Sequence, residues 1–126
     1  MTVDVEALLV AALSPVLGVP VATMTPNPRP VAFVRVVAAG GPARAQRVLD
    51  WADVMWEAWS SADDTGEAAS ALAGRVRDEI DDLVGATHNG AFVVDASATR
   101  PRSFRDDISG TPRYVGQARL LIHANN

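Results

Sequence analysis

A Ser or Thr nucleophile needs a general base within hydrogen-bond reach, and this sequence offers two histidines for that role, His88 and His123. His88 lies in the sequence THNG, where turn chemistry alone accounts for it, and His123 is three residues from the last residue. No cysteine is present, so the sequence provides no thiolate nucleophile, no disulfide and no Cys-based metal site, which excludes redox function. We therefore predict that the protein is not an enzyme.

A cluster of acidic residues is the best candidate for metal chemistry: Asp78, Glu79, Asp81 and Asp82. On a helix, Asp78 and Asp82 point the same way and could share a divalent cation. The stronger interpretation is a solvated charged face, because the cluster lies opposite the apolar stripe that contains Ile80. An interface is the other alternative, because acidic groups near the end of a helix oppose its dipole, at roughly a few tenths of a kcal/mol, unless a partner neutralises them. We predict no bound metal.

Signatures of nucleotide or ligand binding are weak. No G-x-x-x-x-G-K-[ST] or G-x-G-x-x-G occurs, and residues 40–42 (GGP) lack both the spacing and the lysine. Trp51, Trp56 and Trp59 could form a stacking surface for a ligand, but tryptophans in a dense apolar segment more often belong to a core. Part of this set could instead fill a subunit interface, where Trp is enriched. We predict no cofactor.

The composition bounds the class of protein. The 126 residues have the size of one domain, and we treat residues 1–126 as a single domain. Apolar runs such as VAFV and LLVAAL are far shorter than the ~18 residues of a membrane span, which predicts a soluble protein without membrane contact. Asp4 and Glu6 stand where an export signal would carry positive charge, so we expect the chain to be made and used without crossing a membrane. The net charge of −4 and the lack of a basic run argue against sequence-specific nucleic-acid binding.

The N-terminal segment has the apolar spacing of an amphipathic helix over residues 3–14, with Asp4 as the N-cap and Pro15 ending the helix. Residues 19–23 are a candidate short strand, and an exposed proline-rich loop follows them. Residues 31–38 are rich in β-branched side chains and predict a strand. The better candidate for its core face consists of Ala32, Val34 and Val36.

Residues 48–60 (VLDWADVMWEAWS) are so densely apolar that both helical and strand periods fit. Trp enrichment favours a sheet, so we predict a strand over residues 53–60 with Val54, Trp56 and Ala58 on one face. A helix through the same segment is the alternative.

The clearest local signal is an acidic variant of the capping box, in which Asp64 and Glu67 precede a periodic apolar run. We predict a helix that starts at this box and stops at Gly85. Its buried face comprises Ala69, Leu72, Ala73, Val76, Ile80, Leu83 and Val84.

Two further strands are predicted, over residues 91–96 and 114–124. Residues 97–113 between them contain four arginines, and a loop of this length in a compact domain is usually functional, disordered, or both. The predicted fold class is α/β (α+β): a mixed, mostly antiparallel β-sheet flanked by two α-helices.

Taken in this order, the elements resemble the tail terminator proteins of long-tailed bacteriophages. The resemblance covers essentially the whole chain and is carried by Arg29-Pro30-Val31, Gly40-Gly41, the strand-to-helix unit from Trp56 to Leu83, and Thr111-Pro112-Arg113-Tyr114. It implies a hexameric ring at the head-proximal end of the virion tail, which caps the tail tube, stops its polymerisation and presents a surface for joining the head. The implied partners are copies of the chain itself, the tail tube protein and a head-completion or connector protein, and no active site is implied.

Charged residues supply candidate contacts for such a ring. We hypothesise that the arginines of residues 97–113 meet the acidic helix face of a neighbouring copy, or line the surface that contacts the tube protein. The alternatives are a head-tail connector or head-completion protein, a small non-viral ligand-binding module, and an enzyme that uses the acidic cluster with a metal. The candidate interface residues are Arg100, Arg102, Arg105, Asp106, Asp107, Arg113, Asp78, Asp81 and Asp82.

Overall fold

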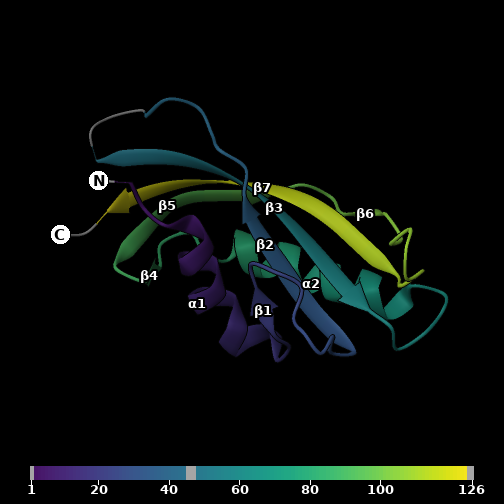
Figure 1. The fold of residues 1–126 in the computed structure, drawn as a ribbon. Helices are drawn as coiled ribbons and strands as arrows, with labels where there is room; N and C mark the ends of the chain where they lie inside the picture. Colours follow the sequence, from purple (N-terminus) through teal and green to yellow (C-terminus); the bar gives the residue numbers. More distant parts are fainter. Residues whose placement is uncertain (1, 45–47, 125–126) are drawn as a thin grey trace.

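The computed structural model describes residues 2–44 and 48–124 and has two α-helices on one face of a twisted seven-stranded sheet (Figure 1). This α+β architecture confirms the predicted fold class. The elements in chain order are α1 (Val5–Leu17), β1 (Val21–Ala22), β2 (Ala32–Ala38), β3 (Leu49–Ser60), α2 (Glu67–Asp81), β4 (Thr87–His88), β5 (Ala91–Ala98), β6 (Arg102–Ser103) and β7 (Arg113–Ala124).

The sheet is mixed and mostly antiparallel. Its strand order is β1-β2-β3-β7-β5-β4, and only β1 and β2 run parallel. The two longest strands, β3 and β7, pair along their lengths from Leu49 opposite His123 to Trp59 opposite Arg113. Along the other edge of β7, β5 is followed by β6. The pair β3 and β7 is therefore the spine of the sheet.

Helix α1 has the predicted N-cap but not the predicted C-terminal end. The Asp4 carboxylate accepts a hydrogen bond from a first-turn backbone N–H at 3.0 Å. Pro15 does not end the helix but lies inside its last turn, where the missing N–H removes only a single backbone hydrogen bond. Burial of Leu17 favours this extra turn, and the helix ends at Gly18 in the left-handed conformation (φ 69°).

The predicted capping box at the start of α2 is wrong, because the capping carboxylate belongs to Asp63 and not to Asp64. The N-cap position is Gly66, not Asp64, and it has no side chain to offer. Instead, the Asp63 carboxylate accepts hydrogen bonds from the backbone N–H groups of Gly66 at 2.9 Å and Ala68 at 3.1 Å. The local acidic signal was correct in kind, but the left-handed turn at Gly66 shifts the cap back to Asp63.

Helix α2 also ends earlier than predicted, at Asp81 rather than beside Gly85. Residues 82–85 form a turn in which the Gly85 N–H donates to the carbonyl of Val93 at 2.8 Å. The predicted buried face of the helix is confirmed except for Val84, which is about half exposed in this turn.

The ambiguous segment before α2 is a strand, and β3 extends four residues further toward the N-terminus than predicted. Trp56 and its predicted neighbours on one face, Val54 and Ala58, are fully buried. The segment 97–113, predicted as one long loop, is partly strand: β5 continues to Ala98, and β6 pairs with the start of β7. This pairing depends on partners that lie beyond the reach of a local pattern.

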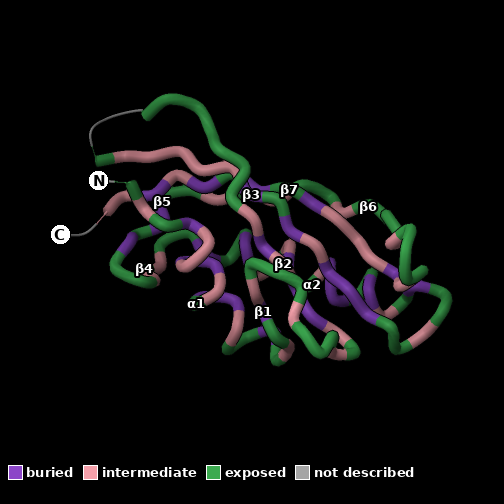
Figure 2. Tube along the Cα trace, viewed as in Figure 1, coloured by how far each residue is buried: buried purple, intermediate pink, exposed green. Residues whose placement is uncertain are grey.

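The hydrophobic core lies between the helices and one face of the sheet, where buried segments of both layers face each other (Figure 2). The predicted core face of β2 is confirmed, since Val34 and Val36 are fully buried there. The three predicted core tryptophans do not share one place: Trp56 is in this core, Trp59 points to the opposite face, and Trp51 is only partly buried outside the core cluster. Among the described residues, no helix is long and apolar enough to cross a membrane.

Candidate assembly interface

The face of the sheet opposite the helices carries side chains in cross-strand rows. We call it the open face, because both helices contact the core side of the strands. Register places Phe33, Trp59 and Arg113 in one row across β2, β3 and β7, and Arg119 opposite Asp53 in another. Since directly opposed residues share a face, these side chains interact across strands.

One end of the open face has its own small aromatic core. The rings of Phe33 and Trp59 stack with centroids 5.2 Å apart and an interplanar angle of 17°. The guanidinium of Arg29, from the proline-rich loop, lies 5.0 Å from the Trp59 ring centroid, and that of Arg113 lies 4.9 Å from it. With this cover, Trp59 is only 5% exposed although it lies on the face opposite the helix-covered core. Each such cation–π contact contributes roughly 0.5 to 1 kcal/mol at a partly exposed site.

Phe104 extends this packing away from the sheet. Its ring lies 4.9 Å from the Arg113 guanidinium and 5.1 Å from that of Arg102. Arginines and rings therefore alternate over four segments of the chain, which are residues 29–33, 59, 102–104 and 113. We call this set the arginine–aromatic cluster; it consists of Arg29, Phe33, Trp59, Arg102, Phe104 and Arg113.

Glu57 compensates part of the positive charge of this cluster. Its carboxylate pairs with Arg35 at 3.3 Å and with Arg113 at 3.7 Å, and it accepts a hydrogen bond from the Trp59 indole N–H at 3.2 Å. The carboxylate thus orients one arginine and the tryptophan of the cluster. Arg102 has no ion pair within the described part of the chain and leaves net positive charge at the surface.

The segment from Phe104 to Arg113, here the 104–113 loop, is held by its own hydrogen bonds. Backbone bonds join its two ends, and Arg105 donates to the carbonyls of Gly110 and Asp64, both at 2.8 Å. Asp106 accepts from the hydroxyl and the N–H of Ser109, at 2.6 and 2.8 Å, and these bonds hold the pKa of Asp106 below its usual range. The loop is therefore an ordered surface feature.

The structure places the predicted interface residues in two groups. Arg102, Arg105, Asp106 and Arg113 come together in the cluster and the 104–113 loop. Asp107 is exposed in the same loop. Their role as an interface stays a prediction.

The acidic helix face lies close to part of that arginine segment within the same chain. Asp78 and Arg100 line one shallow hollow of about 500 Å³ together with Tyr114. Asp81 accepts a hydrogen bond from the backbone N–H of Ala98 at 3.1 Å, at the edge of β5. Asp82 is exposed after the helix. Asp81 therefore has a hydrogen-bond partner within its own chain, whereas the sequence analysis predicted a partner on a neighbouring copy.

Sequence reasoning missed several residues of this surface: Arg29, Phe33, Phe104 and Glu57. A usable signal existed, because strand alternation sends Phe33 and Trp59 to the face opposite the core. Large aromatic rings on the face opposite the core need other side chains to shield them from water.

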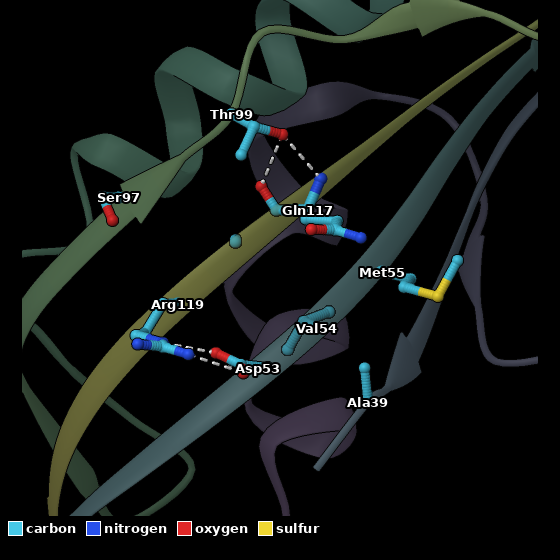
Figure 3. A pocket seen from close by; sticks show the side chains of 9 residues that line it. Ala39, Asp53, Val54, Met55, Ser97, Thr99, Gln117 and Arg119 are labelled. Carbon is cyan, nitrogen blue, oxygen red and sulfur yellow. Dashed lines mark hydrogen bonds and ion pairs between the residues drawn. The ribbon is translucent and has the colours of Figure 1, made fainter. Parts of the chain in front are cut away.

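A second feature of the open face is a hollow of about 340 Å³ across β3, β5 and β7 (Figure 3). At one side, Arg119 holds Asp53 through two hydrogen bonds of 2.6 and 3.0 Å, which lower the pKa of Asp53. At the other, the Thr99 hydroxyl bonds both backbone groups of Gln117, at 2.9 and 3.2 Å. We call this site the open-face hollow; Ala39, Asp53, Val54, Met55, Ser97, Thr99, Gln117, Ala118 and Arg119 line it.

The two histidines considered for catalysis lie at the same end of the sheet, with β5 between their strands. His88 is in the short edge strand β4, and His123 is near the end of β7. Within residues 2–44 and 48–124, no group of three or more His, Asp or Glu side chains is arranged to hold a metal ion.

The chain matches no protein-family model and no curated protein. Among solved structures, it is similar to a chain in the virion of a native gene transfer agent particle, with a TM-score of 0.65 and 19% sequence identity. The similarity covers 90% of this chain and 86% of that chain. At this level of identity, it shows that the two chains share a fold.

Proposed function

We propose that this chain is a structural virion protein, a tail terminator that forms a ring on the tail tube of a long-tailed phage or related particle. The ring ends tube polymerisation and provides the surface on which the head is joined. The observation that carries this proposal is the fold shared with a chain of a virion particle over 90% of this chain. The order of elements, which resembles that of tail terminators, supports the same assignment.

The surface chemistry supports assembly with other proteins. Interface centres are enriched in arginine and aromatic residues and depend on preformed geometry. The arginine–aromatic cluster and the 104–113 loop supply both properties at one end of the sheet. The partners in this proposal are copies of the chain, the tail tube protein and a head-completion or connector protein, and no cofactor takes part.

The test of ring formation is native mass measurement and negative-stain imaging of the purified protein. We expect rings of one size, six copies being the number that the resemblance implies. A protein that stays monomeric at tens of micromolar, alone and with tube protein, contradicts the proposal.

A second experiment separates the terminator role from that of a head-completion protein. The gene is deleted from the particle that encodes it, and the particles are imaged. Loss of a terminator leaves tube polymerisation without a stop, so tails of excess and variable length are expected. Tails of normal length that fail to join heads would instead assign the chain to the head-tail joint.

A further inference from the structure

The 104–113 loop presents an apolar side chain almost entirely to water. Ile108 is 98% exposed at its tip. A single exposed isoleucine is ordinary on a protein surface. Here, however, the backbone on both sides of it is fixed by Asp106 and Arg105, which makes the side chain preorganised for a contact.

The open-face hollow has the chemistry to receive such a side chain. Met55 and Ala39 provide apolar surface in it, and both are exposed. The Arg119 side chain at its edge is 51% exposed, with its guanidinium on Asp53. The hollow therefore combines an apolar patch with the Arg119 guanidinium, which can bind a second carboxylate besides that of Asp53.

We propose that Ile108 of one copy inserts into the open-face hollow of the next copy. This rests on the proposed ring, for which it names the contact between neighbours. Charge complementarity favours a second copy as the occupant, because Asp107 next to Ile108 can pair with the Nη1 group of the half-exposed Arg119, which the two bonds to Asp53 do not use. Ile108 is not used by its own chain, as its exposure shows.

The loop and the hollow are two distinct surfaces that lie far apart on the sheet. The loop joins the sheet at Arg113, and the hollow includes Arg119, six residues further along β7. At ~3.4 Å per residue, this separation is about 20 Å. When each copy offers its loop to one neighbour and its hollow to another, the contact is head-to-tail and closes into a ring if the rotation between copies permits, whereas reciprocal use by the same two copies would give a closed dimer.

The test uses two variants that each destroy one side of the contact. Ile108→Asp removes the inserted side chain, and Ala39→Glu places a charge in the hollow. Each variant alone is expected to shift from ring to monomer. An equimolar mixture restores a single contact, between Ile108 of one variant and the intact hollow of the other. The mixture should therefore give a species of twice the monomer mass of 13.3 kDa and no ring.

The absence of cysteine allows a second measurement on folded protein. Ile108→Cys mixed with Ala39→Cys should form a disulfide-linked pair of chains under oxidation, in excess over either variant alone.

Met24→Asp is the matched control for Ile108→Asp, because Met24 is also an exposed apolar residue (75%) but lies outside both surfaces. This variant should keep the ring.

The outcomes separate this contact from the proposed function. A wild-type ring that survives Ile108→Asp, or a mixture that gives no pair and no cross-link, overturns the contact and leaves the terminator proposal standing. A wild-type protein that never leaves the monomer overturns both.

Discussion

The indole ring of Trp56 fills the space that a side chain at Gly116 would occupy. The two residues are opposite each other in the pairing of β3 and β7. A Cβ atom at position 116 would lie 2.3 Å from Cζ2 of the indole and 2.6 Å from Cε2. Trp56 is fully buried and is the largest side chain of the core. Its ring fits there because residue 116 is a glycine and has no Cβ atom.

Replacing this glycine therefore has a predictable cost. Gly116→Ala is expected to lower the free energy of unfolding by about 1 to 3 kcal/mol, because it overpacks a rigid ring in the core. Gly74→Ala is the matched control: a Cβ at Gly74, inside α2, meets nothing within 4 Å, and the substitution should raise stability by roughly 0.5 to 1 kcal/mol. Denaturant unfolding of both variants measures the difference. Equal midpoints would contradict the proposed packing.

The cap of α2 offers a test with adjacent residues of one type. Asp63→Ala removes the acceptor for two backbone N–H groups and should cost about 0.5 to 2 kcal/mol of stability. Asp64→Ala should change stability by less than about 0.5 kcal/mol, because among the described residues its only hydrogen bond is to its backbone carbonyl, from Arg105. If thermal or denaturant unfolding shows that Asp64→Ala costs more stability than Asp63→Ala, the capping box predicted from the sequence is correct after all.

The Asp53–Arg119 pair makes stability depend on pH in acid. The hydrogen bonds from Arg119 lower the pKa of Asp53 from its ordinary 3.8, so ionised Asp53 favours the folded state. The contribution is complete above pH 3.8 and is lost as the pH falls through the lower folded value. The effect is small and sensitive to salt because the pair is partly exposed.

Unfolding midpoints of wild type and Asp53→Asn between pH 2 and 6, measured at low and high salt, test this dependence. The two curves should converge at the acid end, separate as the pH rises from the lowered folded value to 3.8, and run parallel above it. A constant separation across the range would show that Asp53 acts without its charge. Asp106 titrates in the same direction in both proteins, and the comparison removes its effect.

Arg102 in β6 and Arg105 in the 104–113 loop should respond differently to charge reversal. Arg102→Glu should lower stability by at most about 1 kcal/mol, because Arg102 makes no ion pair in the described residues and loses only its contact with the Phe104 ring, but it should weaken ring assembly and change its salt dependence. Arg105→Glu should also raise hydrogen exchange in the loop, because it removes bonds to Gly110 and Asp64. Unchanged assembly and salt dependence in both variants would refute the role of these arginines as contacts.

Sequence patterns predicted those features that local periodicity determines. The core faces of β2 and β3 follow from alternation around Val34 and Trp56, and the buried stripe of α2 follows from its helical spacing. The ends of the helices were harder to predict from the sequence. Pro15 and Asp64 were given their usual local roles, but burial of Leu17 and the turn at Gly66 determined the result.

The candidate site was predicted only in part, because it is made by pairing distant segments. Arg102, Arg105 and Arg113 were identified from their place in a long charged segment. The position of Arg113 over Trp59 follows from the register of β7 on β3, which the sequence does not display. The same holds for the open-face hollow, whose lining comes from four strands or their ends.

The pairing of β3 with β7 also has a consequence for the timing of folding. Its partners are more than fifty positions apart in the chain, so the spine requires a long loop to close before its contacts form. During synthesis, β1 to β5 and both helices emerge first, and the sheet stays divided until β7 has been made. The arginine–aromatic cluster and the open-face hollow both contain β7 residues. In a nascent chain that has not reached β7 both surfaces are therefore incomplete, and the proposed ring cannot form prematurely through them.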